Sequence, residues 1–409
     1  MLRPMLIALI VLVGATAAGA QLVPRLPALP IDVPGLPAAR GLADDVLRAP
    51  SDAARMLDQA RRAAIARLVR DNPHSIALDP EGFPARAGEV VIDDPKDAVI
   101  AAAVAKGYRV IERGDVLGVG YVRLAVPGQQ SLPSAIREIR KLGGEVSADQ
   151  LHMPSGATDG RPASVANGGG TLIGVIDGGV AGAAISTGFA IGAPRDNDHA
   201  TAVASLIGGS GKVRGGLPGA RIASADVYGS DPAGGNATAI AKALGWMVQQ
   251  RVSVVTISLV GPANPLLAKV VAAAQARGLV IVAAVGNNGP AAPPGFPASY
   301  PGVIAVTGVD GRNRALIEAG RASHLDYAAP GADMLAAGIA GRVFRVRGTS
   351  FAAPLVAATT ARFYPSPSPA AVGAALKRVD ALARDLGPRG PDRIYGRGLV
   401  CGDCRTLAK

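Results

Sequence analysis

The stretch Thr171-Leu172-Ile173-Gly174-Val175-Ile176-Asp177 sets the fold class of this chain of 409 residues. It is a short apolar run with β-branched residues after a glycine-rich segment, which is the pattern of a strand buried on both faces of a parallel sheet. Such a strand delivers Asp177 to its carboxyl end. In open α/β sheets, functional sites are built along that edge.

Further strands and helices alternate downstream of this strand. Because alternation of this kind calls for a parallel sheet covered on both faces, we expect an α/β, three-layer, doubly wound, mostly parallel sheet. The chain has no Gly-x-Gly-x-x-Gly after the first strand and no Gly-Lys-Ser or Gly-Lys-Thr, and Ala352 removes a Gly-x-Ser-x-Gly elbow. The predicted strands are 221–228, 252–259, 279–285 and 303–309, and the predicted helices are 237–250 and 265–277.

A candidate nucleophile lies in Gly348-Thr349-Ser350-Phe351-Ala352-Ala353-Pro354, between a glycine turn and an alanine-rich helix. A serine hydroxyl is a poor nucleophile at neutral pH, so it needs a base and a third group that orients the base. Amides at a helix start favour negative charge near Ser350.

Few residues can serve as the base, since the chain has only four histidines. His199 starts a helical pattern that runs over 199–207 and stops at two glycines. A strand over 279–285 leads into Gly286-Asn287, where the Asn287 amide and the Ser350 N–H could stabilise a developing oxyanion. Taken singly, these motifs are also typical of a turn, a structural histidine and a loop.

In this order, Asp177, His199 and Ser350 resemble the site of the subtilisin-like serine peptidases (subtilases, peptidase family S8), over roughly 165–400. The resemblance implies Asp177 as orienting carboxylate, His199 as base, Ser350 as nucleophile and Asn287 as oxyanion donor. Further matching segments are 176–178, 258–259, 286–287, 300–306, 329–331 and 348–354, and 394–400 looks like the strand that closes the family's catalytic domain.

The resemblance also implies where a polypeptide substrate would lie. The extended peptide would add as a strand beside Ser258-Leu259-Val260-Gly261, with a first pocket walled by Ala283, Ala284 and Val285 and floored near Ala298. These walls carry no acid, so we expect an apolar or mid-sized side chain before the scissile bond.

The chain departs from the family pattern near the histidine. Ala200 replaces a usual glycine, and only 21 residues separate Asp177 from His199, so a loop that carries substrate contacts or an ion site in relatives is trimmed. Asp196 and Asp198 could help to hold calcium, but two acids beside a histidine are more often a turn. We assign no metal and expect no required cofactor.

The N-terminal part predicts export. Residues 1–20 have a charged start, a short apolar centre and a small-residue end, as in a signal peptide, so we expect a secreted or periplasmic protein with no integral membrane segment after signal cleavage. Residues 21–86 contain a proline-rich linker and an amphipathic helix over 51–70. That helix could lie on a membrane surface, but we expect it to pack on the protein.

Residues 87–154 predict a small α+β, ferredoxin-like module before the catalytic domain at 155–400. By its placement it is similar to the pro-domain that subtilases use as folding aid and inhibitor, in which case the segment 151–164 occupies the substrate cleft and is cut there. A permanent binding domain is the alternative. Its predicted elements, in the order strand, helix, strand, strand, helix, strand, are 89–92, 98–106, 108–112, 120–126, 132–142 and 145–148.

The tail at 401–409 holds both cysteines of the chain, Cys401 and Cys404. In an oxidising compartment a disulfide is the first interpretation and a free pair the second, whereas zinc would need more ligands.

The net charge of +11 lies almost wholly on 155–409. Nucleic-acid binding is not indicated, because the arginines are scattered and aromatic residues are only 3% of the chain. The sequence therefore predicts a monomeric, secreted serine endopeptidase that acts on polypeptides through an acyl-enzyme and is held by its own pro-domain. A catalytically silent relative that binds peptides in the same cleft is the alternative.

Overall fold

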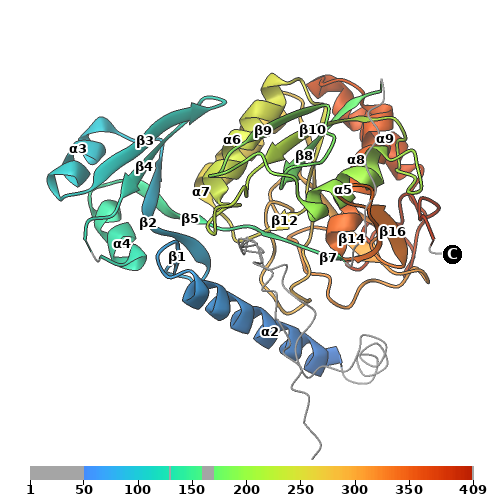
Figure 1. The fold of residues 1–409 in the computed structure, drawn as a ribbon, viewed down its shortest axis with the longest axis horizontal. Coiled ribbons are helices and arrows are strands. Elements are labelled where there is room, and N and C mark those ends of the chain that lie inside the picture. Colours follow the sequence, from blue (N-terminus) through green and yellow to red (C-terminus); the bar gives the residue numbers. More distant parts are fainter. Residues whose placement is uncertain (1–49, 129, 159–169, 408–409) are drawn as a thin grey trace, which may run out of the picture.

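The computed structural model describes residues 50–128, 130–158 and 170–407, which form a small sheet-and-helix module beside a larger α/β body (Figure 1). The predicted signal peptide at 1–20 and the proline-rich stretch up to 49 lie outside the described residues, as does the part of the predicted cleft segment beyond 158.

The larger body is built on a seven-stranded, entirely parallel sheet, which confirms the predicted fold class. The strand order is β15-β14-β13-β11-β8-β10-β9. From β8 the chain passes to the edge strand β9, returns to β10 beside β8, and then moves outward on the other side of β8 through β11, β13, β14 and β15. The carboxyl ends of β8 and β11 therefore flank the switch point at which such sheets build sites. The strands are β8 (Leu172–Asp177), β9 (Ile185–Gly188), β10 (Arg221–Asp226), β11 (Val254–Ile257), β13 (Val280–Ala284), β14 (Ile304–Val309) and β15 (Tyr327–Pro330).

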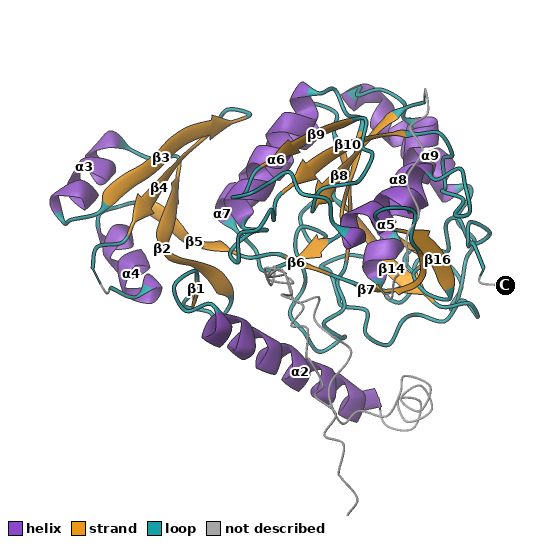
Figure 2. Cartoon of the chain, in the orientation of Figure 1, coloured by secondary structure: helices purple, strands orange, loops and turns teal. Residues whose placement is uncertain are grey.

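Helices cover both faces of this sheet and make the three layers (Figure 2). Neighbouring strand residues point to opposite faces. Val254, for example, packs in the core beneath α5 and α8, whereas Val255 packs in the core beneath α6 and α7. The helices of this body are α5 (Asp198–Gly208), α6 (Ala237–Gln249), α7 (Pro265–Ala276), α8 (Ala353–Phe363) and α9 (Val372–Asp380), with the 3₁₀ turns η1 (Thr349–Phe351) and η2 (Pro369–Ala371).

The small module is an antiparallel sheet in the order β5-β2-β4-β3, with two helices on one face, which is the ferredoxin-like arrangement. The predicted boundary at 87 falls inside its first long strand, and an additional short strand, β1, pairs with the start of that strand. Its elements are β1 (Ile76–Leu78), β2 (Pro84–Asp93), α3 (Asp97–Ala105), β3 (Arg109–Val116), β4 (Val119–Ala125), α4 (Leu132–Lys141) and β5 (Glu145–Gln150).

The other face of the module's sheet packs on helices α6 and α7. Val116 and Tyr121 join the apolar core of that side of the large body. At the edge of the contact, Lys242 forms an ion pair with Glu112, and Lys269 lies 2.6 Å from Asp93. Apolar burial and paired charges together hold the module in one orientation on the two helices.

Helix α2 (Pro50–Asp71) is the predicted amphipathic helix, and it packs on the protein through part of its apolar side. Leu68 is buried against Ile76 and Leu151, and Leu57 lies against Gly289 of the large body, whereas Met56 is exposed. In the described part of the chain, no helix combines the length and apolar character needed to cross a membrane.

The predicted closing strand at 394–400 is wrong. This segment makes isolated bridges with Tyr327 and Ala328 and is otherwise turns, because Gly396 and Gly398 adopt positive φ angles of 63° and 127° that interrupt an extended strand. Strands β9 and β15 were not predicted, and neither were the short strands β6 (Met153–Pro154), β7 (Ala157–Thr158), β16 (Met334–Ala337) and β17 (Val343–Arg347). Strand β12 (Leu259–Val260) lies in the segment 258–261, beside which an extended peptide was expected, and it pairs with β6.

Candidate active site

Asp177 and His199 meet at the carboxyl edge of the sheet. Asp177, at the end of β8, is 1% exposed, and its Oδ2 lies 2.8 Å from His199 Nδ1. Asn197 caps α5 and accepts hydrogen bonds from the N–H groups of His199 and Ala200, which fixes the first turn that carries the imidazole. The carboxylate thus favours the tautomer with its proton on Nδ1, leaving Nε2 free to accept one.

Ser350 lies in the 3₁₀ turn that precedes α8, on the same edge. Its neighbour Phe351 stacks near the His199 ring, with ring centroids 5.4 Å apart. The Ser350 hydroxyl donates to the backbone oxygen of Ser258 at 3.0 Å, and His199 Nε2 is buried with no hydrogen-bond partner among the described residues. A rotation of the Ser350 side chain is therefore needed before its hydroxyl can donate to the imidazole.

Asn287 is held against the turn that carries Ser350. Its Oδ1 accepts from the Thr349 N–H at 3.0 Å, and the Thr349 hydroxyl accepts from the Gly286 N–H at 3.1 Å. A Cβ at Gly348 would lie 2.6 Å from Asn287 Nδ2 and 2.9 Å from the Ser155 carbonyl oxygen, so only glycine leaves this space open. Gly348 also has a φ of 141°, which disfavours any side chain.

The chain's own segment 151–158 runs through the cleft beside these groups. Its β6 pairs antiparallel with β12, and its β7 pairs antiparallel with β17. Between the two, the Ser155 carbonyl accepts a hydrogen bond from the Ser350 N–H at 3.0 Å, and the two serine hydroxyl oxygens are 2.8 Å apart. The peptide bond that follows Ser155 is thereby presented to the Ser350 side chain.

The predicted substrate-binding residues fall into two groups. One group contacts the cleft segment 151–158, and the other lies in the cores beside the sheet. Ser258 O accepts from the Ser155 N–H at 3.2 Å, Leu259 pairs with Pro154, and Gly261 lies against the His152 ring. The predicted pocket residues Ala284 and Ala298 are both fully buried, one in each of the two cores beside the sheet. Their roles as wall and floor stay predictions.

Three residues of the cleft escaped the sequence reasoning. Ser155 occupies the site itself, Tyr228 donates from its hydroxyl to the His152 carbonyl at 2.6 Å, and Thr349 locks the Asn287 loop. Thr349 could have been suspected from its place beside Ser350. Nothing local in the sequence distinguishes Ser155 or Tyr228, because both act through contacts with distant segments.

Of the two acidic residues considered for a cation, Asp196 is exposed and Asp198 has other partners. Asp198 accepts from the Ile339 N–H and pairs with Arg342 at 2.5 Å. Among the described residues, the one group of three acids close enough to hold a metal is Asp93, Asp94 and Glu145, and the Lys269 ammonium already lies within 3.1 Å of each. Cys401 and Cys404 form a disulfide bond in this structure.

Comparison with known proteins agrees with this geometry. The model of the subtilase family matches residues 168–398. Subtilisin amylosacchariticus from Bacillus subtilis subsp. amylosacchariticus is 33% identical over 160 residues, which are 38% of this chain and 41% of the relative. Subtilisin DY from Bacillus licheniformis is 33% identical over 162 residues, which are 38% and 57% of the two chains. The matched region thus spans only about half the length of these relatives.

Solved structures share the fold at low sequence identity. Fervidolysin from Fervidobacterium pennivorans, described as a keratinolytic enzyme related to subtilisin, superposes with a TM-score of 0.64 and 19% identity, over 81% of this chain and 63% of its own. The epidermin leader peptide processing serine protease from Staphylococcus aureus gives 0.59 and 16%, over 78% and 98%. Because the family model covers more than half of the chain, on the elements that carry Asp177, His199 and Ser350, this chain belongs to the subtilase family.

Proposed function

We propose that this chain is a serine endopeptidase made as an exported precursor, which cuts its own Ser155–Gly156 bond and then hydrolyses other polypeptides. One observation carries the proposal. The Ser155 carbonyl accepts from the Ser350 N–H while antiparallel pairing holds the chain on both sides of the bond, as a substrate would be held. Export is supported by the signal-peptide pattern of residues 1–20.

In the first step, the Ser350 hydroxyl turns from Ser258 O toward His199. His199 Nε2 takes the proton as the Ser350 oxygen bonds to the Ser155 carbonyl carbon. Asp177 stabilises the imidazolium that forms, through its 2.8 Å contact with Nδ1. The carbonyl oxygen becomes an oxyanion that keeps the Ser350 N–H as donor and gains the Asn287 amide.

In the second step, the bond between the Ser155 carbon and the Gly156 nitrogen breaks. His199 gives its proton to that nitrogen, which leaves as a new amino terminus, and an ester joins Ser155 to Ser350. Water then attacks the ester, His199 again takes the proton, and the Ser350 hydroxyl is restored as the carboxylate of Ser155 departs. The buried carboxylate and imidazole need no further group to move these protons.

The module at 76–150 then acts as pro-domain. Its sheet rests on α6 and α7, and its end leads directly into the cleft segment, so the product of the first cut still fills the site that a substrate needs. Several hydrogen bonds support this placement, among them the Asp149 carboxylate accepting from the Thr238 N–H at 2.9 Å. Release of the pro-domain is therefore required before cleavage of other chains.

The single substrate feature supported by contacts is a small residue before the cut. Ser155 lies with its hydroxyl beside that of Ser350, and its backbone is held by Ser258 on one side. We expect peptides with serine or alanine at this position, and proline before it, to be cut faster than peptides with charged or bulky residues there.

Intact-mass and N-terminal analysis of the purified full-length chain tests the proposal. The wild type should yield a fragment that begins at Gly156, whereas Ser350→Ala should remain uncut. Adding wild-type enzyme to Ser350→Ala separates cutting within one chain from cutting between chains. A wild-type chain that stays intact and is not labelled by a fluorophosphonate at Ser350 would contradict the proposal.

A catalytically silent peptide-binding protein is the second candidate. It is favoured by one observation: the Ser350 hydroxyl donates to Ser258 O and His199 Nε2 has no partner among the described residues. Labelling of Ser350 by the fluorophosphonate, followed by loss of labelling in His199→Ala, would exclude this candidate, because only an activated hydroxyl reacts.

A further inference from the structure

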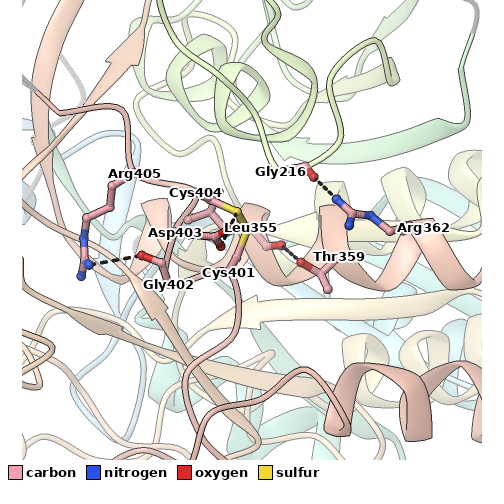
Figure 3. The surroundings of a disulfide bond; sticks show 9 residues. All are labelled: Gly216, Leu355, Thr359, Arg362, Cys401, Gly402, Asp403, Cys404 and Arg405. Atoms are coloured by element: carbon pink, nitrogen blue, oxygen red, sulfur yellow. Dashed lines mark hydrogen bonds between the residues drawn. A yellow bond between two sulfur atoms is a disulfide. The ribbon is translucent and has the colours of Figure 1, made fainter.

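A cavity lies away from the cleft, at the end of α8 opposite Ser350. It has a volume of about 690 Å³ and is lined by the loop 214–218, by Thr359 and Arg362 of α8, by Leu382 and Arg384, and by the C-terminal segment that holds the disulfide. Figure 3 shows part of this region, with Cys401 and Cys404 next to Arg362 and Arg405. Since α8 rises about 1.5 Å per residue, Arg362 is on the order of 18 Å from Ser350 along the helix.

Four arginines from four different segments line this cavity: Arg214, Arg362, Arg384 and Arg405. Among the described residues, none of these guanidinium groups forms an ion pair with a carboxylate. Arg362 donates to the Gly216 carbonyl at 2.9 Å. The lining includes a single acid, Asp403, so its formal charge is +3.

Arg405 lies deepest of the four. Its Nη groups reach backbone carbonyls and the Asn313 side chain, and its Nε is buried without a hydrogen-bond partner among the described residues. Burial and the nearby charge of Arg384 lower the pKa of Arg405, against the opposing effect of two acids outside the lining, Asp310 and Asp333. Arg384 and Arg405 thus lie close enough for their charges to interact, and neither forms an ion pair with a carboxylate among the described residues.

Some other arginines of the catalytic body form ion pairs. Arg342 pairs with Asp198, Arg347 with Glu318, and Arg397 with Asp326 and Asp380. Several exposed arginines, such as Arg251 and Arg277, form no ion pair among the described residues. What distinguishes the cavity is that four arginines that form no ion pair among those residues line the same hollow.

We propose that this cavity binds a small polyanion that carries two or more carboxylate or phosphate groups. Guanidinium groups form paired, charge-assisted hydrogen bonds with both kinds of oxygen anion. The volume lies within the range of small-molecule sites, and four cations spaced around it suit a ligand with several negative charges better than a single halide. The proposal does not rest on the peptidase activity.

Binding would also tie together four segments that are remote in sequence. The ligand would join the loop 214–218, the end of α8, the residues after α9 and the C-terminal tail. A ligand that binds only the folded state raises its stability in proportion to the logarithm of its concentration above the dissociation constant. The melting temperature should therefore rise with polyanion concentration.

Calorimetric titration and thermal melting of the full-length Ser350→Ala chain test this proposal. Citrate and inorganic pyrophosphate serve as the carboxylate and phosphate probes, up to about 10 mM, with sodium chloride at matched ionic strength as the reference. Saturable binding of either probe is expected, and the tighter of the two identifies the preferred anion.

Variants locate the binding. Arg214→Gln combined with Arg384→Gln removes two exposed charges with no described side-chain contact and should weaken binding about tenfold or more. The matched control, Arg137→Gln with Arg140→Gln on α4, should leave the dissociation constant within about twofold. Asp403→Asn removes the opposing carboxylate and should tighten binding. Because misfolding cannot tighten binding, this variant shows whether the weaker binding of the arginine variants comes from lost charge. Absence of saturable binding by both probes, or equal weakening in the control, would overturn the proposal.

Discussion

The carbonyl oxygen of Ser155 lies 3.0 Å from the backbone nitrogen of Ser350, although the two residues are 195 positions apart. This contact joins the end of the small module to the start of α8. The contact places one particular peptide bond, Ser155–Gly156, at the candidate nucleophile Ser350. The hydrogen bond is of the kind that strengthens when the carbonyl oxygen becomes negative.

Gly156→Val should slow self-cleavage about 10²-fold or more. A Cβ at position 156 would lie 2.6 Å from the Phe351 ring and 3.3 Å from Ser350 Cβ, so the bulkier residue displaces the junction from the nucleophile. The half-time for appearance of the cut fragment measures the effect. Gly211→Val is the control, because a Cβ at Gly211 meets nothing within 4 Å, and it should process at the wild-type rate.

Much of the fold could be predicted from the sequence, because the signals are local. The runs at 172–176 and 279–285 carry no polar side chain, as is typical of strands buried on both faces, and helices α6 and α7 lie between strands in the expected alternation. The same reasoning gave Asp177 and His199 their places at the sheet edge. Their contact at 2.8 Å joins the end of β8 to the first turn of α5.

The features that could not be predicted from the sequence depend on pairing between segments that are far apart in the chain. Strands β6 and β7 are two residues long and exist only because each finds a distant partner. The position of Ser155 in the cleft is set by these pairings and has no sequence motif of its own. The prediction for 394–400 failed for another reason: it rests on the resemblance to the family's closing strand, whereas two glycines with positive φ angles interrupt an extended strand here.

Thr349→Val should lower turnover of a peptide substrate by roughly tenfold to a hundredfold while the fold is kept. The change removes the acceptor of the Gly286 N–H, which is then buried without a partner, at a cost of about 1–3 kcal/mol. The loop that carries Asn287 loses its anchor, so kcat should fall more than KM rises. Thr349→Ser restores the hydroxyl and should recover most of the activity, whereas equal losses in both variants would point to packing alone.

Asp177→Asn should reduce kcat by about 10⁴-fold with little change in KM. The amide can donate to His199 Nδ1, which stabilises the tautomer with its proton on Nε2 and leaves no base for the Ser350 hydroxyl. Steady-state kinetics on a peptide with serine before the cut would measure this. Asp196→Asn, two residues before the helix that carries His199, is the matched control and should keep kcat within about twofold. A variant Asp177→Asn with near-normal kcat would remove Asp177 from the proposed mechanism.

The affinity of the cut pro-domain for the catalytic domain should fall as the pH drops from 6.5 to 4, because the released His152 becomes protonated. In the docked state His152 is fully buried, its two ring nitrogens have no hydrogen-bond partner among the described residues, and burial lowers its pKa to about 4. Once released into water, the same imidazole has an ordinary pKa near 6.5. Docking therefore favours the neutral ring. The contribution of the neutral His152 ring to pro-domain affinity is complete above pH 6.5 and is lost as the pH falls from 6.5 to 4.

The loss should amount to on the order of 10²-fold in pro-domain affinity, or about 3 kcal/mol across the window. Glu112 acts in the same direction but only below about pH 4.5, because the hydrogen bonds of Lys242, Tyr121 and Arg123 outweigh burial and lower its pKa from 4.5 to about 2. Asp149, whose pKa burial raises, acts in the opposite direction, so wild type must be compared with a variant. The fraction of pro-domain that separates from the cleaved chain on size-exclusion chromatography, measured from pH 7 to pH 4, should rise steeply in the wild type and in the exposed control His74→Phe. It should rise only weakly in His152→Phe, whose ring stays uncharged at every pH. Equal pH profiles for His152→Phe and wild type would show that another group governs release.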